Sequence, residues 1–283
     1  MRDGVALPGR RAGAVTRGGH RPRPAALQAP GPLLVAHRGF SRDGLENSLV
    51  AFAAALDLGA DVLETDVRTT ADGVLVAFHD DRLDRVSDAT GLLARTDWSD
   101  VARARIGGRE PVPRLAEVLE AFPTAVLNVD VKTPGAVAPL VDLLRRSGAW
   151  ERVVVASFSE RRRRAVVRRL PPGTATSAGA PLVAEVVAAV RALPGRLRGP
   201  AVRRTLAGVD VVQVPERVAT PALVRAVHGA GRPVHVWTVD DVPTMHRLLD
   251  LGVDGLVTDR TDLLGQVLRA RRGRGASGGA AHP

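Results

Sequence analysis

Residues 61–67, Asp-Val-Leu-Glu-Thr-Asp-Val, place two carboxylates one residue apart in a short β-rich run. A turn signal at Asp72-Gly73 follows, which predicts that the chain runs back along a hairpin partner at 73–78. Side chains two positions apart on a strand point to the same face, so Glu64 and Asp66 should share one face. We therefore expect 61–67 to be a strand whose functional face is acidic.

On both sides of this run, short apolar segments alternate with amphipathic ones, which predicts parallel strands joined by crossover helices. Strands are expected at 33–36, 61–67, 125–132, 153–158, 174–178, 209–214, 234–239 and 255–258. Helices are expected at 46–58, 115–122, 159–169, 182–192, 220–230, 242–251 and 261–270. With 73–78 counted as a finger off the second strand, these elements predict a single-domain α/β fold, a (β/α)8 TIM barrel with a short excursion at 81–113. An open doubly wound sheet alternates in the same way, but no glycine-rich phosphate loop follows the first strand.

The net charge of +10 lies almost entirely at the two ends of the chain. Residues 1–30 contain six Arg and one Asp, and residues 266–283 contain four Arg and no acid. Both segments are rich in Gly, Ala and Pro or Ser, a composition that predicts disordered basic tails. The expected catalytic domain is therefore 31–265, which is nearly neutral, so we expect no specific nucleic-acid partner.

Composition also bounds the class of protein. Cysteine is absent, which excludes disulfides and thiolate chemistry. No uninterrupted apolar run reaches about 18 residues, and no continuous apolar run precedes Pro30, so we expect neither a transmembrane helix nor a secretory signal. A cytoplasmic location is the default expectation, and the sequence sets no oligomeric state.

Polar side chains gather at the carboxyl ends of the expected strands, where barrel enzymes place their active sites. The candidates are His37, Arg38, Glu64, Asp66, His79, Asp80, Asn128, Asp130, Lys132, Gln213, Trp237 and Asp259. Each alone has a structural explanation, such as a barrel-filling ion pair. Because acidic, basic and positively charged side chains from three strands meet at one rim, a functional site is favoured over a structural one. Converging carboxylates repel one another unless a cation lies between them, and oxygen ligands suit Mg²⁺ or Ca²⁺.

The chain resembles the glycerophosphodiester phosphodiesterase family, whose motifs it carries in family order over nearly the whole expected domain. The motifs are His37-Arg38-Gly39, Glu46-Asn47-Ser48, Glu64-Thr65-Asp66-Val67, Asp72-Gly73, His79-Asp80, Pro113-Arg114-Leu115, Asp130-Val131-Lys132, Ser157-Phe158, Trp237-Thr238 and Thr258-Asp259. The resemblance implies a TIM barrel, in agreement with the strand count. It also implies metal-dependent hydrolysis of a small-molecule glycerophosphodiester to an alcohol and glycerol 3-phosphate.

The resemblance assigns roles to particular residues. The general acid and base correspond to His37 and His79. One divalent cation, Mg²⁺ or Ca²⁺, would be held by Glu64, Asp66 and Asp130. Substrate-binding roles fall on Arg38 and Lys132 for the phosphate, with Trp237 and Gln213 as further expected contacts. Aspartate at 130 departs from the usual glutamate and withdraws the carboxylate by one methylene.

Several alternatives stay open at this point. The nucleophile is either water or the glycerol 2-hydroxyl, which would give a cyclic phosphate, and either histidine can begin as the base. A phospholipase-type phosphodiesterase acting on lysophospholipids or phosphatidylinositol would use a similar barrel but needs an apolar rim. A nonenzymatic protein that binds nucleic acid or membranes through its Arg tails would leave the converging polar residues unexplained.

Overall fold

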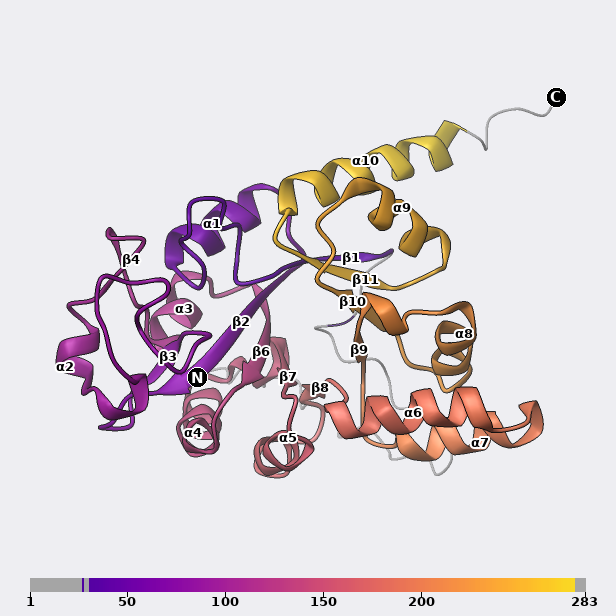
Figure 1. The fold of residues 1–283 in the computed structure, drawn as a ribbon, viewed down its shortest axis with the longest axis horizontal. Helices are drawn as coiled ribbons and strands as arrows, with labels where there is room; N and C mark the ends of the chain where they lie inside the picture. Colours follow the sequence, from indigo (N-terminus) through magenta and orange to yellow (C-terminus); the bar gives the residue numbers. More distant parts are fainter. Residues whose placement is uncertain (1–26, 28–30, 278–283) are drawn as a thin grey trace, which may run out of the picture.

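Eight parallel strands form the centre of the computed structural model, which describes Leu27 and residues 31–277 (Figure 1). In chain order they are β1 (Leu33–Ala36), β2 (Val62–Thr69), β6 (Val126–Val131), β7 (Val153–Ala156), β8 (Ala175–Thr176), β9 (Val212–Pro215), β10 (Val234–Trp237) and β11 (Gly255–Thr258). Neighbours hydrogen-bond in the order β8-β7-β6-β2-β1-β11-β10-β9. The eight expected strands are present, and their order is that of a (β/α)8 barrel that closes between β8 and β9.

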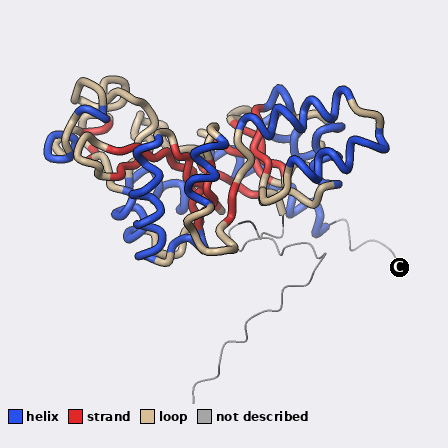
Figure 2. Tube along the Cα trace, turned by 90° about the horizontal axis from the view of Figure 1, so that it is seen from below, coloured by secondary structure: helices blue, strands red, loops and turns tan. Residues whose placement is uncertain are grey.

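Helices surround the strands, which occupy the middle of the molecule (Figure 2). They are α1 (Leu49–Asp57), α3 (Leu115–Ala121), α4 (Val137–Ser147), α5 (Glu160–Val167), α6 (Ala180–Ala192), α7 (Gly195–Thr205), α8 (Pro221–Gly229), α9 (Val242–Asp250) and α10 (Thr261–Ser277). Short 3-10 segments are η2 (Leu93–Arg95), η3 (Pro134–Ala136), η4 (Ala149–Arg152) and η5 (Glu216–Val218). Polar caps begin several helices: the Ser48 hydroxyl, for example, accepts a hydrogen bond from the Ala51 N–H at 3.1 Å.

Two kinds of hydrophobic core hold the barrel together. Inward-facing residues such as Val35, Val62 and Val211 pack with Leu27 inside the barrel. Between the strands and the helices, larger clusters of Val, Leu and Ala are buried. Because the inner layer consists of small aliphatic side chains, the polar residues at the strand ends stand above an apolar floor.

The excursion after β2 carries more structure than its polar sequence indicates. β3 (Leu75–Ala77) pairs antiparallel with β2, as the Asp72-Gly73 turn predicts. Beyond it lie α2 (Trp98–Val101) and a small hairpin of β4 (Arg105–Ile106) and β5 (Glu110–Pro111). Phe78, Leu93 and Ile106 are buried in a cluster beneath this segment. The excursion therefore has its own small core and covers one side of the barrel mouth.

The barrel closes between β8 and the chain before β9 by three main-chain hydrogen bonds: the Ala178 N–H donates to the Val211 carbonyl at 3.0 Å, and the Asp210 and Val211 N–H groups donate to the Thr176 carbonyl at 2.9 and 3.3 Å. One parallel bridge joins Ser177 and Val211, and β8 contains only two residues. Beyond this β8–β9 seam, α6 and α7 lie against each other and project away from the barrel (Figure 1). The interrupted sequence at 180–208 thus forms two helices, with Pro200 inside α7.

The C-terminal boundary differs from the expected one. We expected a tail from residue 266, but α10 continues to Ser277 because Leu264, Val267 and Leu268 are buried against the barrel. The expected tail residues 1–26, 28–30 and 278–283 lie outside the described residues. None of the helices in the described part of the chain is long and apolar enough to cross a bilayer.

Candidate active site

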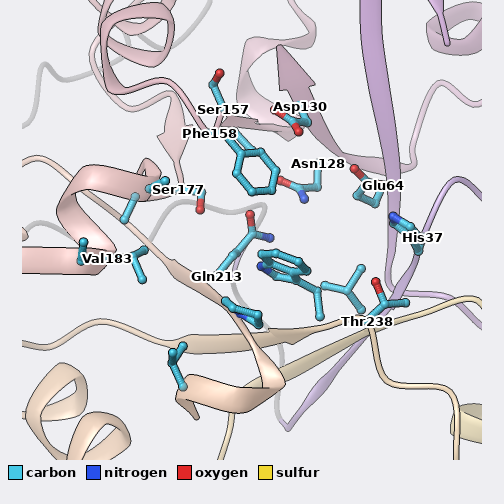
Figure 3. A pocket seen from close by; sticks show the side chains of 18 of the residues that line it. His37, Glu64, Asn128, Asp130, Ser157, Phe158, Ser177, Val183, Gln213 and Thr238 are labelled. Carbon is cyan, nitrogen blue, oxygen red and sulfur yellow. The ribbon is translucent and has the colours of Figure 1, made fainter. Parts of the chain in front are cut away.

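One cavity of about 850 Å³ opens at the carboxyl ends of the strands, and Figure 3 shows the side chains that line it. The nine residues that were assigned catalytic, metal-binding or substrate-binding roles all line it, whereas the candidates Asp80 and Asp259 do not: the nine are His37, Arg38, Glu64, Asp66, His79, Asp130, Lys132, Gln213 and Trp237. The structure therefore brings together residues that are up to 200 positions apart in the chain.

His37 follows β1 and is fixed from both its backbone and its ring. Its N–H donates to the Thr258 carbonyl at 2.9 Å, and its Nδ1 lies 2.8 Å from Oδ1 of Asp259. Burial lowers the pKa of His37, but the hydrogen bond to Asp259 and the charge of Glu64 outweigh burial, so the pKa is raised above 6.5. With Nδ1 engaged, Nε2 is the nitrogen left for proton transfer.

The next two residues make a tight turn. Arg38 has φ +55° and Gly39 has φ +83°, and a Cβ on Gly39 would lie 2.7 Å from the Ala51 carbonyl carbon. Glycine is therefore required where the turn passes α1. In this turn the Arg38 N–H donates a hydrogen bond to Glu64 Oε2 at 3.1 Å. The Arg38 guanidinium donates to Glu46 Oε1 at 3.0 Å.

β2 and β6 set the carboxylates side by side. Their register pairs Glu64 with Asn128 and Asp66 with Asp130. The Lys132 ammonium lies 2.8 Å from Asp66 Oδ1 and 2.7 Å from Asp130 Oδ2, so it bridges the two acids.

The charge on Asp66 is well compensated. Arg38 Nε lies 3.1 Å from its Oδ2, a charge contact rather than a well-aligned hydrogen bond. The Asn47 side chain donates to the same oxygen at 3.2 Å. Burial raises the pKa of Asp66, but Lys132 and Arg38 outweigh it and hold the pKa below its usual value.

Glu64 and Asp130 are compensated less well. Burial raises the pKa of Glu64 to about 8, and the charge of Asp66 adds to this. Burial also raises the pKa of Asp130, whose Oδ1 is buried without a hydrogen-bond partner among the described residues. Buried carboxylate oxygens without a cation are costly, so this part of the site lacks positive charge.

The fit to a metal ion is mixed. Unpaired oxygen on Asp130 and the raised pKa of Glu64 are what a bound divalent cation would relieve. Within residues 31–277, however, no group of three or more His, Asp or Glu side chains is already drawn together around a common point. Lys132 holds Asp66 and Asp130 instead. The donor atoms suit a hard cation, and Lys132 supplies part of the charge that the cation would bring.

His79 follows β3 and has its own carboxylate partner. Its Nδ1 lies 2.6 Å from Asp80 Oδ1. Arg85 donates to both oxygens of Asp80, at 2.5 and 3.1 Å, and to both oxygens of Glu46, at 2.9 and 2.7 Å. A continuous network of side-chain hydrogen bonds thus joins His79, through Asp80, Arg85 and Glu46, to Arg38.

Sequence reasoning missed this network. Glu46 and Asp80 appear in the motifs without a role, and Arg85 lies in the excursion with no signal beyond its charge. Its partners become visible only when α1 and the excursion meet in space.

Gln213, Trp237 and Phe158 also line the cavity. The Phe158 and Trp237 rings meet edge to face with centroids 5.6 Å apart, and Phe158 is 53% exposed. The Lys132 ammonium lies 5.6 Å from the Phe158 centroid. Aromatic rings therefore lie beside the charged residues in this cavity.

The model of the glycerophosphoryl diester phosphodiesterase family matches residues 37–263. The chain belongs to this family of enzymes. Among curated members, the probable glycerophosphodiester phosphodiesterase 2 of Mycobacterium tuberculosis is 44% identical over 259 residues, covering 89% of this chain and 97% of that protein. A family member from Caldanaerobacter subterraneus is 28% identical over 254 residues, covering 84% of this chain and 98% of the other.

Solved structures of the family agree with the barrel. The glycerophosphodiester phosphodiesterase from Agrobacterium tumefaciens superposes with a TM-score of 0.70 at 26% identity, over 84% of this chain and 99% of that one. An Oleispira antarctica phosphodiesterase in complex with the product sn-glycerol-3-phosphate gives a TM-score of 0.71 at 23% identity, over 84% of this chain and 97% of that one. These matches confirm the predicted family and fold, and a nonenzymatic binding protein is no longer an alternative.

Proposed function

We propose that the enzyme hydrolyses glycerophosphodiesters to an alcohol and glycerol 3-phosphate, with a divalent cation and with His37 and His79 as general acid and base. The observation that carries the proposal is that two imidazoles from separate strand ends line one cavity with three buried carboxylates. The Oleispira antarctica relative in complex with sn-glycerol-3-phosphate supports the same product.

Glu64, Asp66 and Asp130 are the residues that would hold Mg²⁺ or Ca²⁺, with Glu64 and Asp130 supplying the oxygens that lack positive partners. A cation bound there would neutralise a nonbridging phosphate oxygen and polarise the phosphorus. Lys132 and Arg38 add positive charge beside it, the first as a point charge and the second as a planar donor. Because both also pair with carboxylates, they are held in place before the substrate arrives.

The two histidines are arranged alike. Each ring is fixed at Nδ1 by an aspartate, Asp259 for His37 and Asp80 for His79. Each therefore offers Nε2 to the reacting atoms. One removes the proton of the nucleophile, and the other protonates the departing alcohol. The same pair serves attack by water or by the glycerol 2-hydroxyl.

A substrate panel tests the proposal. Purified enzyme stripped with chelator should release glycerol 3-phosphate from glycerophosphodiesters only after Mg²⁺, Ca²⁺ or Mn²⁺ is restored. His37→Ala and His79→Ala should each lower kcat by roughly 10²–10⁴-fold while circular dichroism stays unchanged. Full activity after chelation would refute the metal, and near-normal turnover by either histidine variant would refute the acid–base pair.

A further inference from the structure

The catalytic cavity does not end at its polar rim but continues along α6. Ala180, Val183, Ala184, Val187 and Ala188 line it from one face of this helix, at the spacing of successive turns. Arg191 lines its outer end, which makes the lined stretch of helix about 16 Å long. We call this extension the α6 groove.

The facing wall of the α6 groove is apolar as well. Pro215 and Val218, at the end of β9 and in η5, line it opposite the helix, and Phe158 stands where the groove meets the catalytic residues. Figure 3 shows Val183 across the cavity from His37 and Glu64. The groove lies between α6, which follows β8, and the segment that follows β9.

The chemistry of the α6 groove excludes most polar occupants. No carboxylate is among the described residues that line it beyond the rim, and its only charged groups are Arg191 and Arg217. Both side chains are exposed, so their aliphatic parts can extend the wall while the guanidinium groups reach water. A partly exposed apolar channel that joins an active site is typical of a binding groove for an apolar part of the substrate.

Asn128 gives a second, independent indication of the ligand. It is 5% exposed, its amide lies in the cavity near Phe158 (Figure 3), and its Oδ1 is buried with no donor among the described residues. A buried acceptor without a donor is costly unless a ligand supplies one. A free hydroxyl on the glycerol would do so.

We propose that the enzyme accepts lysophospholipids, with the single acyl chain in the α6 groove and the free glycerol hydroxyl donating to Asn128. This inference rests on the proposed phosphodiesterase function and names its substrate class. Water adds to phosphorus, the bond between phosphorus and the head-group oxygen breaks, and the head-group alcohol leaves with a proton. The other product is a monoacylglycerol 3-phosphate. A diacyl lipid lacks the hydroxyl and fits the site less well.

Choline release provides a matched assay, since glycerophosphocholine and lysophosphatidylcholines share one leaving group. The full chain is assayed with glycerophosphocholine and with hexanoyl, octanoyl and decanoyl lysophosphatidylcholine, each below its critical micelle concentration. We expect kcat/KM to rise along the series, because each buried methylene favours binding by roughly fourfold. Glycerophosphoinositol, read by release of glycerol 3-phosphate, is the additional arm: it carries a net negative charge where glycerophosphocholine is zwitterionic, so Arg191 and Arg217 would favour it if charge rather than the acyl chain decided binding.

Substitutions in the α6 groove then test where the acyl chain of the substrate binds. Ala184→Phe and Ala188→Phe each place a large side chain in the α6 groove. Each should lower the kcat/KM for octanoyl lysophosphatidylcholine, divided by the kcat/KM for glycerophosphocholine, by about tenfold or more, since several methylenes lose their contacts. Ala138→Phe, on an exposed position of α4 away from the cavity, is the matched control and should leave the ratio unchanged.

The outcomes separate the two proposals. Turnover of glycerophosphocholine without any gain from the acyl chain overturns the inference alone. A ratio that neither groove variant changes does the same, as does a preference for glycerophosphoinositol over the octanoyl substrate. Failure to release choline from any choline substrate, or glycerol 3-phosphate from glycerophosphoinositol, with each divalent ion overturns the proposed function and this inference with it.

Discussion

His37 Nδ1 and Asp259 Oδ1 lie 2.8 Å apart and join the end of β1 to the end of β11 across a parallel strand pair. The aspartate has two effects on the imidazole. It fixes the ring with Nε2 free, and it raises the pKa against the opposing effect of burial. An activity that depends on this ring should therefore respond to its partner.

Asp259→Asn should lower the pKa of His37 in the metal-free protein, because the carboxylate charge and the strong acceptor are lost. The folded pKa lies above 6.5, so His37 contributes stability that is fully present below pH 6.5 and is lost as pH rises through the folded value. The Asp259→Asn variant should therefore have a lower free energy of unfolding than the wild type at acidic pH, where this contribution is fully present. An NMR titration of the histidine Cε1–H signals, together with thermal unfolding at several pH values, measures both.

Asp254→Asn is the control for this variant, since Asp254 pairs with His228 at 2.7 Å outside the cavity. It should leave the midpoint of His37 unchanged. An equal midpoint for His37 in the wild type and in Asp259→Asn would contradict the role of Asp259.

Arg85→Ala should lower kcat by roughly 10–100-fold, the usual effect of removing a group that orients catalytic ligands. Arg85 is a positioning residue: it lowers the pKa of Asp80 to about 2, and Asp80 holds the His79 ring. Arg85→Lys should recover little, because an ammonium cannot donate to Asp80 and Glu46 in the same forked geometry. Steady-state kinetics should show the loss in kcat more than in KM, with an altered pH profile.

Arg82→Ala is the matched control, because Arg82 is in the same segment and pairs only with exposed Asp84. It should keep normal kinetics. A similar loss of kcat in both variants would mean that the segment as a whole is disturbed.

Lys132→Met should destabilise the metal-free protein by about 3–5 kcal/mol, the usual cost of leaving buried carboxylates without their partner. The ammonium compensates Asp66 and Asp130, whose side chains are 1% and 9% exposed. Mg²⁺ should recover more stability in this variant than in the wild type, because a cation replaces the missing charge. Denaturant unfolding with chelator and with Mg²⁺ measures the difference, and equal recovery in the two proteins would argue against a cation at this position.

Asp130→Asn should weaken divalent-cation binding by about tenfold or more, while Asp130→Glu should retain it, since glutamate keeps the charge and extends it by one methylene. Calorimetric titration of the stripped proteins gives the affinities. Identical affinity in Asp130→Asn and the wild type would remove Asp130 from the proposed ligand set.

The sequence predicted the barrel and the polar rim because both follow from local patterns. Alternating apolar and amphipathic runs mark the strands and helices, and Glu64 and Asp66 share a face because strands have a period of two. Their closeness to Asp130 follows once β2 and β6 are neighbours in a parallel sheet.

Other features depend on contacts that no local pattern encodes. Arg85 reaches Glu46, 39 positions away, and only the packing of the excursion brings them together. The α6 groove depends on where α6 packs relative to the end of β9 and η5. The last helix was expected to end at residue 270, and the arginine-rich composition beyond Val267 gave no signal that α10 continues to Ser277.

Three main-chain hydrogen bonds cross the seam between β8 and the chain before β9, and the Asp210 carboxylate accepts a fourth from the Thr176 N–H at 3.0 Å. Parting β8 from β9 would leave these main-chain groups unpaired, so the strands on both sides of the seam keep their positions, as β1, β2 and β6 do. Substrate preference in this barrel can therefore diverge independently of its chemistry through the exposed side chains of α6 that line the cavity, with no change in the strands that carry the reacting groups.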